Sequence, residues 1–266
     1  METPDRYIMT APMSLLWRSG GALQVGLDAS GAVLLPRAPE GADVALRALR
    51  SSRTLAEVAR LAPLVPRAWI AETVATLVAL GLVAPASAAR RATVAVVGEG
   101  VLADTVARLL EAEGRQLIVT AGLTSEAQSA DLVVACASTV EPDRVDVREL
   151  AGLPHLILRA EPERAVVGPF VAPGAGYACV TCTDLVRRDL DRDWPHLLAQ
   201  LCRTRHTATP QQVAWASALA SAQLTAWLVG RTPEASGATW ELDAHSGQVG
   251  VRRWPRHPDC GCALID

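Results

Sequence analysis

Short apolar runs separated by turn-forming residues occupy the first 85 residues of the chain. Three runs, at residues 14–18, 22–26 and 32–36, have the length and composition of β-strands. Three helical patterns follow, at residues 42–49, 55–61 and 67–80. Thr54 and Glu57 match the Thr-x-x-Glu capping box, which predicts that the middle helix begins just after Thr54. This order of elements predicts a winged-helix α+β module over residues 1–85.

The rest of the chain has the pattern of an α/β domain, and it follows a small-residue linker at residues 86–91. An apolar run at residues 92–97 leads into a Gly-x-Gly-x-x-Ala turn and then a helical pattern, which is the opening unit of a Rossmann-like fold. Further strands are predicted at residues 116–120, 131–136 and 154–158, a long helix at 209–229 and a hairpin at 240–254. We therefore predict a Rossmann-like domain over residues 92–266. The small residues of the long helix allow close approach of either a second subunit or the sheet.

The glycine turn, formed by Gly98, Gly100 and Ala103, does not by itself establish a nucleotide site. A dinucleotide-binding turn is paired with an acid near the end of the second strand. Residues 120–125 contain no acid, and the first one is Glu126. We therefore interpret this as a vestigial nucleotide turn, whose glycines serve the backbone of the fold.

Composition limits the classes of function further. The chain has 266 residues, half of them apolar, and a formal net charge of −3, so it has no basic field for nucleic acid. All 25 positively charged residues are arginines, which removes Walker, Schiff-base and general-base lysines. The N-terminus lacks the apolar segment of a signal peptide, and no run of about 20 apolar residues is present. We expect a cytoplasmic protein that binds neither nucleic acid nor membrane.

The last helix of the N-terminal module favours a peptide over DNA. Arg67 and Glu72 are its only charges, too few to hold a phosphate backbone. An extended peptide can instead add to the free edge of the third strand and rest on the apolar helix. The residues that we expect to contact it are Val33, Leu34 and Leu35 on the strand and Trp69, Ile70 and Val74 on the helix. The alternative is that these six side chains are simply the core of the module.

Four cysteines near the end of the chain predict a metal site. Cys179 and Cys182 form one close pair, and Cys260 and Cys262 form a second pair after 77 intervening residues. Two such pairs supply the four thiolates of a tetrahedral structural zinc site with no open position for water. A redox Cys-x-x-Cys, disulfides and unrelated buried thiols are the alternatives. Cys136 and Cys202 lack a partner at ligand spacing, and we expect both to be core residues.

Several motifs together resemble one known family. They are the glycine turn, a Gly-Pro-Phe-Val-x-Pro run at residues 168–173 before Cys-x-x-Cys, a Pro-initiated Ala-rich helix, a hairpin and a terminal His-Pro-x-Cys-x-Cys. This set resembles the ThiF/MoeB superfamily of ubiquitin-activating-enzyme-like proteins. More narrowly it resembles the bacteriocin (TOMM) cyclodehydratase branch, which binds leader peptides for YcaO enzymes that make thiazole- and oxazole-containing peptides. The resemblance covers nearly the whole chain, because that branch also carries an N-terminal PqqD-like RiPP recognition element.

The resemblance implies a ThiF-type domain with structural zinc. It also implies three partners: the leader region of a precursor peptide, a YcaO-type enzyme, and a second copy of the chain in a homodimer. Superfamily enzymes adenylate a carboxyl terminus using an Asp-x-Thr-Asp-Asn run and a lysine. The matching run at residues 135–139 has no acid, and the chain has no lysine. We therefore expect a non-catalytic recognition scaffold with no catalytic residue and no ATP. The alternative is an ATP-dependent adenylating enzyme acting on a peptide or carrier-protein carboxylate.

Overall fold

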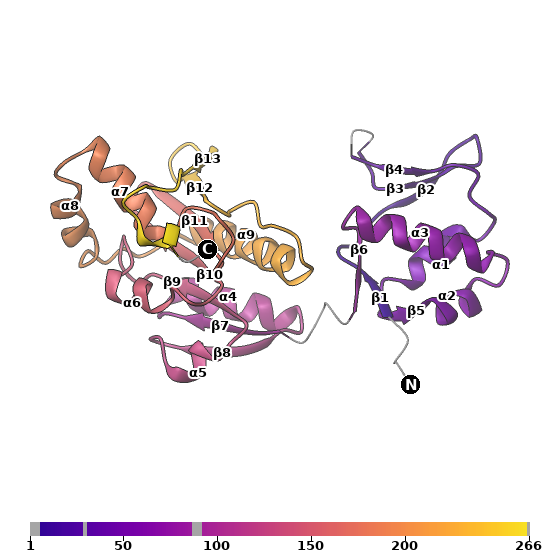
Figure 1. The fold of residues 1–266 in the computed structure, drawn as a ribbon, viewed down its shortest axis with the longest axis horizontal. Helices are drawn as coiled ribbons and strands as arrows, with labels where there is room; N and C mark the ends of the chain where they lie inside the picture. Colours follow the sequence, from indigo (N-terminus) through magenta and orange to yellow (C-terminus); the bar gives the residue numbers. More distant parts are fainter. Residues whose placement is uncertain (1–5, 29–30, 87–91, 265–266) are drawn as a thin grey trace. The chain divides into compact units, whose positions relative to one another are not determined.

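The chain folds into two compact units, which we describe separately. The computed structural model describes residues 6–28, 31–86 and 92–264. One unit contains Met1–Arg90 with Leu228–Arg231, and the other contains Arg91–Trp227 with Thr232–Asp266 (Figure 1). Of the predicted linker at residues 86–91, residues 87–91 lie outside the described part of the chain.

The first unit contains the three strands and three helices that the sequence predicts. The strands are β2 (Leu15–Trp17), β3 (Leu23–Val25) and β4 (Val33–Leu35), and the helices are α1 (Ala42–Ala48), α2 (Leu55–Leu61) and α3 (Arg67–Ala79). The strands form an antiparallel sheet in the order β2-β3-β4. Side chains of this sheet and of all three helices share one core, which includes Leu23, Leu46 and Leu77.

A second small sheet was not predicted from the sequence. Its central strand is β1 (Arg6–Met9), flanked by β5 (Arg53–Thr54) and β6 (Val83–Pro85). Strands of two to four residues are too short to show a clear alternation of apolar and polar positions, so these strands could not be predicted from periodicity. The predicted capping box is confirmed: Glu57 donates its backbone N–H to Thr54 Oγ1 at 3.1 Å, and Thr54 donates its own to Glu57 Oε2 at 2.9 Å.

The second unit is built on a seven-stranded mixed sheet in the order β13-β12-β11-β10-β9-β7-β8. The parallel strands are β7 (Thr93–Val97), β8 (Gln116–Thr120), β9 (Leu132–Cys136) and β10 (His155–Ala160). The antiparallel strands are β11 (Arg164–Val171), β12 (Ala238–Asp243) and β13 (Val249–Arg253). This arrangement confirms a Rossmann-like α/β domain, and β12 with β13 form the predicted hairpin.

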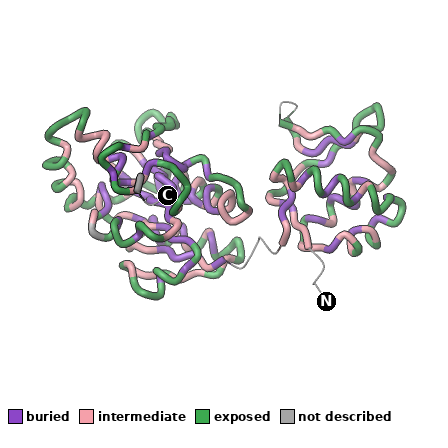
Figure 2. Tube along the Cα trace, in the orientation of Figure 1, coloured by how far each residue is buried: buried purple, intermediate pink, exposed green. Residues whose placement is uncertain are grey.

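Helices cover both faces of this sheet, which explains why its parallel strands are continuously apolar. Val94 and Val96 share a core with α4 (Val101–Ala112) and α9 (Pro210–Leu228). On the other face of the sheet, Ala95 shares a core with α5 (Ser125–Gln128), α6 (Arg144–Glu149) and the start of α7 (Val180–Leu190). The remaining helix is α8 (Trp194–Leu201), and a short 3₁₀ turn spans Gly261–Leu264. Figure 2 shows the buried residues in purple in the interior of this unit and the exposed residues in green around them.

The small residues of α9 lie in two different environments, some buried and some exposed. Ala216 and Ala220 are buried in the core beside the sheet, whereas Ala218 and Ala222 are exposed. Close packing on the sheet therefore accounts for part of the small-residue pattern. Among the described residues, no helix combines the length and apolarity needed to cross a membrane.

Candidate functional site

The four cysteines predicted as metal ligands meet at one place in the second unit. Cys179 precedes the first residue of α7, and Cys182 lies in the first turn of that helix. Cys260 and Cys262 come from the turn that follows β13. The four Sγ atoms all lie within 4.8 Å of one another. These cysteines can therefore hold a metal ion that joins α7 to the end of the chain.

The distances between the sulfur atoms match a tetrahedral thiolate site. Cys179 Sγ lies 3.8 Å from Cys182 Sγ and 3.6 Å from Cys260 Sγ, and Cys182 Sγ lies 3.4 Å from Cys262 Sγ. A zinc ion with bonds of about 2.3 Å places its sulfur ligands about 3.8 Å apart. The cluster needs little movement to fit an ion of that size.

The cysteines of the cluster have pKa values that are shifted in opposite directions. Burial opposes ionisation of Cys182, but backbone N–H donors from His257 and neighbouring thiols hold its pKa below the ordinary thiol value. Burial raises the pKa of Cys260 and of Cys262. A bound cation displaces these protons, because thiolates rather than thiols are the ligands.

His257 orders the loop that carries the last two cysteines. Its backbone N–H donates to Cys182 Sγ at 3.4 Å, and its Nδ1 accepts the backbone N–H of Asp259 at 3.1 Å. The Nε2–H therefore donates to Asp189 Oδ2, 2.8 Å away on α7. This bond to His257 lowers the pKa of the Asp189 carboxyl. The imidazole thus ties the terminal loop to α7 and fixes the turn around the sulfur cluster.

The glycine turn lies at the carboxyl end of β7, where parallel α/β sheets bind ligands. Gly98 and Gly100 both have positive φ, of 137° and 91°. Any side chain on Gly98 would collide with the carbonyl oxygen of Cys136 at the end of β9. Ala103 is buried in the first turn of α4, where it packs against the sheet. The close approach of backbone segments thus explains the motif without a nucleotide.

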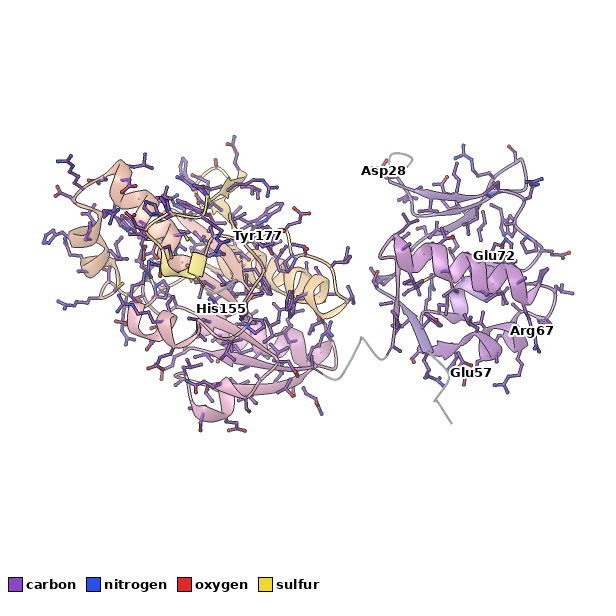
Figure 3. All side chains as sticks on the ribbon, viewed as in Figure 1. Asp28, Glu57, Arg67, Glu72, His155 and Tyr177 are labelled. Atoms are coloured by element: carbon purple, nitrogen blue, oxygen red, sulfur yellow. The ribbon has the colours of Figure 1, made fainter. Side chains whose placement is uncertain are left out.

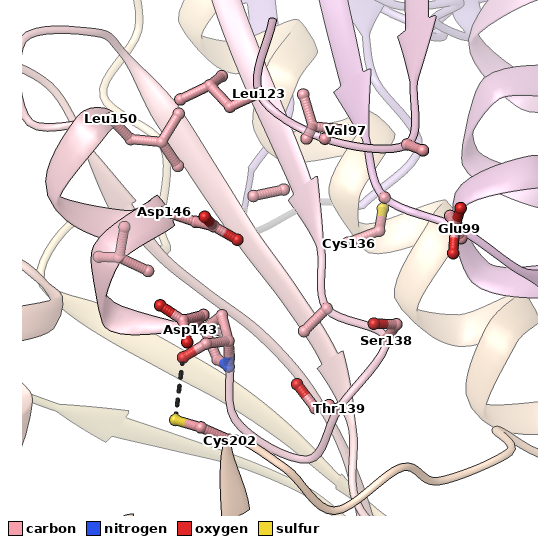
Figure 4. Close-up of a pocket in the computed structure, with 17 residues that line it drawn as sticks. Val97, Glu99, Leu123, Cys136, Ser138, Thr139, Asp143, Asp146, Leu150 and Cys202 are labelled. Atoms are coloured by element: carbon pink, nitrogen blue, oxygen red, sulfur yellow. Dashed lines mark hydrogen bonds between the residues drawn. The ribbon is translucent and has the colours of Figure 1, made fainter. Parts of the chain in front are cut away.

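A cavity of about 250 Å³ nevertheless opens beside this turn, and its wall holds carboxylates that the sequence analysis did not place there (Figure 4). Asp143 and Asp146, from the segment that begins α6, line it together with Glu99, Ser138 and Thr139. The run at residues 135–139 has no acid, as noted above. Tertiary structure supplies acids from the next segment instead, and no sequence signal linked them to the turn.

The two remaining cysteines have different surroundings, and the expectation for one was wrong. Cys136 is buried in the core, and burial raises the pKa of its thiol to about 12. Cys202, expected in the core, is only half-buried. It lies at the wall of the cavity and donates its Sγ–H to the Pro142 carbonyl at 3.3 Å. The apolar pattern of α8 suggested burial, but α8 has no buried residue.

A neighbouring cavity of about 500 Å³ lies at the N-terminus of α4. It shares Glu99 and Ser138 with the first cavity and is also lined by Arg205 and His206. Backbone N–H groups at a helix N-terminus together with a guanidinium favour an anion. Arg205 was not predicted as a site residue, because an isolated arginine between two helices carries no motif.

The structure places five of the six predicted peptide-contact residues in one cluster of the first unit. Val33, Leu35, Trp69, Ile70 and Val74 belong to the core cluster of the first unit or pack against it. Ile70 and Val74 are only 2% exposed, whereas Val33 and Trp69 are half-buried. Leu34 points to the opposite face of the sheet, beside Gln24, and is 51% exposed. A peptide at this place would therefore reach Val33, Trp69 and the backbone of β4.

The edge of β4 is the feature that gives this cluster a possible ligand. In the described part of the chain, β4 pairs with β3 on one side and has no strand on the other. Its outer N–H and C=O groups are therefore positioned to pair with another extended chain.

No protein-family model and no curated protein matches this chain. Solved structures do match it. The heterocyclase TruD superposes with a TM-score of 0.62 at 16% identity, over 98% of this chain and 43% of the TruD chain. A heterocyclase in complex with substrate and cofactor gives 0.57 at 13% identity, over 93% of this chain and 38% of the other.

A second kind of neighbour matches over its full length. E. coli MccB in complex with AMPCPP and selenomethionine MccA superposes with a TM-score of 0.55 at 13% identity, over 97% of this chain and 99% of MccB. This chain thus spans less than half of the heterocyclases but nearly all of MccB. At such identities the likeness concerns the fold alone, which this chain shares with MccB and with part of TruD.

Proposed function

We propose that this protein is a non-catalytic recognition and scaffold protein in the biosynthesis of thiazole- and oxazole-containing peptides. It binds the leader region of a precursor peptide and presents that peptide to a YcaO-type cyclodehydratase. The observation that carries this proposal is the free edge of β4, together with the half-buried Trp69 in the core cluster to which β4 contributes.

Peptide binding at this edge follows from strand addition. An extended segment pairs its backbone with β4, and main-chain hydrogen bonds supply much of the affinity. Trp69 offers a large, rigid ring in the core cluster that includes β4, and such aromatic anchors dominate the energetics of peptide interfaces. Specificity comes from the side chains that rest on Val33 and Trp69. We propose that the first unit is a PqqD-like recognition element of the winged-helix type.

The comparisons support this assignment in two ways. The neighbours include heterocyclases, one of them in complex with substrate and cofactor, and MccB bound to MccA. In TruD and MccB the likeness extends over 97% or more of this chain, so it includes the first unit as well as the second. A peptide-handling role is therefore consistent with the whole fold.

The second unit supplies the scaffold. We propose that its four cysteines bind structural zinc, with all four positions of the ion filled by protein and none left for catalysis. The same unit would dock the YcaO-type enzyme and a second copy of the chain. This protein would then contribute recognition, while its partner performs the chemistry.

Peptide binding can be tested with a displayed library of random twelve-residue peptides sorted on the full-length protein. The Kd of an enriched peptide is then measured by fluorescence anisotropy. Trp69→Glu should weaken binding at least about 30-fold, because an anchor residue contributes about 2 kcal/mol or more. Leu34→Glu is the matched control: it lies on the same strand but on the opposite face, so it should change the Kd less than about threefold.

Zinc content, measured in each variant, reports on folding of the rest of the chain. Failure to enrich any peptide, or a zinc-loaded Trp69→Glu protein that binds as tightly as the wild type, would reject the proposal.

An adenylating activity is the second candidate, and the cavities at the glycine turn favour it. Asp143 and Asp146 offer oxygen ligands of the kind that magnesium takes, and Arg205 offers a phosphate partner in place of the missing lysine. Carboxylate-dependent exchange of pyrophosphate into ATP would establish this activity. Absence of ATP binding at millimolar concentration would eliminate it.

A further inference from the structure

A separate cavity of about 250 Å³ lies in the second unit, beside the sulfur cluster. It opens near the start of β10, at the opposite end of that strand from the glycine-turn side. Its walls come from α6, from the loop at residues 172–177 and from the turn that carries Cys260 and Cys262. Figure 3 labels two lining residues, His155 and Tyr177.

The loop leaves space for a ligand. Gly174 and Gly176 both have left-handed backbone conformations, with φ of 71° and 70°, and a side chain on either would meet nothing within 4 Å. The two glycines therefore add no side chain to the wall of the cavity. Val147, Val171 and Val180 make much of the remaining wall apolar.

Apart from the cysteines, the charged side chains that line the cavity are all positive. Arg148 and Arg256 both line it, and no aspartate or glutamate among the described residues does. The other cavities described above all contain acids. His155 adds no charge: burial lowers the pKa of its imidazole, and its Nδ1–H donates to the Leu153 carbonyl at 2.8 Å.

The two arginines have different roles. Arg256 donates from Nη2 to the Cys262 carbonyl at 2.9 Å, so it is tied to the loop that carries the last two cysteines. Arg148 comes from α6 and is exposed. Among the described residues, its guanidinium forms no ion pair with an acid. Arg148 is therefore placed to receive an anion that enters from solvent.

We propose that this cavity binds an apolar group that ends in a carboxylate. The carboxylate pairs with Arg148, and the apolar part lies against the valines and the ring of Tyr177. A volume of about 250 Å³ suits one residue-sized group. The carboxyl end of a peptide chain and a free small carboxylic acid share this chemistry. The site does not depend on the edge of β4, which belongs to the other unit.

The test is a titration of the ¹⁵N-labelled full-length protein with N-acetyl-leucine, followed by amide chemical shifts. The amides of Gly174 and Gly176 should shift, with a Kd in about the millimolar range expected for a ligand of this size. N-acetyl-leucinamide, which lacks the charge, should bind at least about tenfold more weakly. Arg148→Gln should produce a similar loss. Arg192→Gln, an exposed arginine outside the cavity, is the matched control and should leave the Kd unchanged.

A second variant, Ala151→Phe, fills the cavity from an exposed position and should also abolish the shifts. Tighter binding of N-acetyl-leucine than of 4-methylpentanoate identifies a peptide carboxyl terminus as the ligand, whereas equal binding identifies a free acid. The proposal is overturned by an absence of shifts at these glycines, by equal affinity for acid and amide, or by unchanged binding in Arg148→Gln.

Discussion

At the scale of single residues, the two glycines of the turn after β7 have different reasons to be glycine. Gly98 combines a φ of 137° with a close approach to the Cys136 carbonyl, so both the backbone and the space exclude a side chain. Gly100 has a φ of 91° but open space around its Cα. The first position therefore holds β7 against β9, whereas the second only shapes the entry into α4.

Replacing these glycines should separate the two effects. Gly98→Ala should lower the free energy of unfolding by about 3 kcal/mol, since it adds a collision to backbone strain. Gly100→Ala should lower it by about 1 kcal/mol through strain alone. Urea unfolding followed by tryptophan fluorescence measures both. Equal losses in the two variants would contradict the role given to the Cys136 carbonyl.

At the scale of elements, a buried ionic cluster joins the loop after β9 to β10 and α7. Glu141 is 3% exposed and forms ion pairs with Arg144 and Arg187 at 2.9 Å and with Arg159 at 3.2 Å. The Arg187 guanidinium also stacks over the Trp194 ring, 4.6 Å from its centre. Burial opposes ionisation of Glu141, but the three arginines hold its pKa at about 2. The loop that lines the glycine-turn cavity is thus held by charge pairing.

This cluster should make stability depend on pH. The pKa of Glu141 is lower in the folded chain than the ordinary value of 4.5, so its contribution is complete above about pH 5 and is lost as pH falls toward 2. Glu141→Gln should cost about 3 kcal/mol at pH 7, because it removes the carboxylate that three buried arginines share, although Arg144 keeps Asp184 and Arg159 keeps Glu161 as partners. The difference from wild type should shrink between pH 5 and pH 2. Urea unfolding across this range measures it.

Glu126→Gln, an exposed substitution on α5, is the control and should leave the pH profile unchanged. A constant difference between Glu141→Gln and wild type at all pH values would show that the carboxylate charge is not what stabilises the loop.

At the scale of the whole molecule, the two units have separate cores. The core of the first unit contains side chains of β2–β4 and α1–α3, and the sulfur cluster belongs to the second unit. A metal bound at the four cysteines would therefore stabilise one unit only. Its loss should leave the edge of β4 intact.

Loss of the proposed metal should thus leave the proposed peptide binding at β4 unchanged. Cys182→Ser should lower the zinc content from one ion per chain to near zero and should lower the Tm of the second unit by about 6–12 °C, equivalent to about 3 kcal/mol. Peptide affinity at β4 should not change. Calorimetry, metal analysis and anisotropy provide the three readouts. Cys202→Ser lies outside the cluster and should retain its zinc; loss of zinc there, or retention in Cys182→Ser, would contradict the assignment.

Local patterns in the sequence predicted much of this fold. The capping box at Thr54, the strand-turn-helix around Gly98 and the hairpin of β12 and β13 are all formed by neighbouring residues. The small sheet of β1, β5 and β6 was missed because its short strands pair across 46 residues or more of sequence. Cys202 was misplaced because the apolar residues of α8 are not buried.

The sequence by itself determined the types and order of the main elements, the identity of the four clustered cysteines and the absence of lysine chemistry, because these depend on local periodicity, spacing and composition. Only the tertiary structure decided which face of β4 is covered, since alternation along three residues does not say where the core lies. It also decided that Asp143 and Asp146 line the glycine-turn cavity and that Arg148 lines the cavity beside the cysteines. Such sites bring together side chains from separate elements, and their proximity follows from the packing of helices on the sheet.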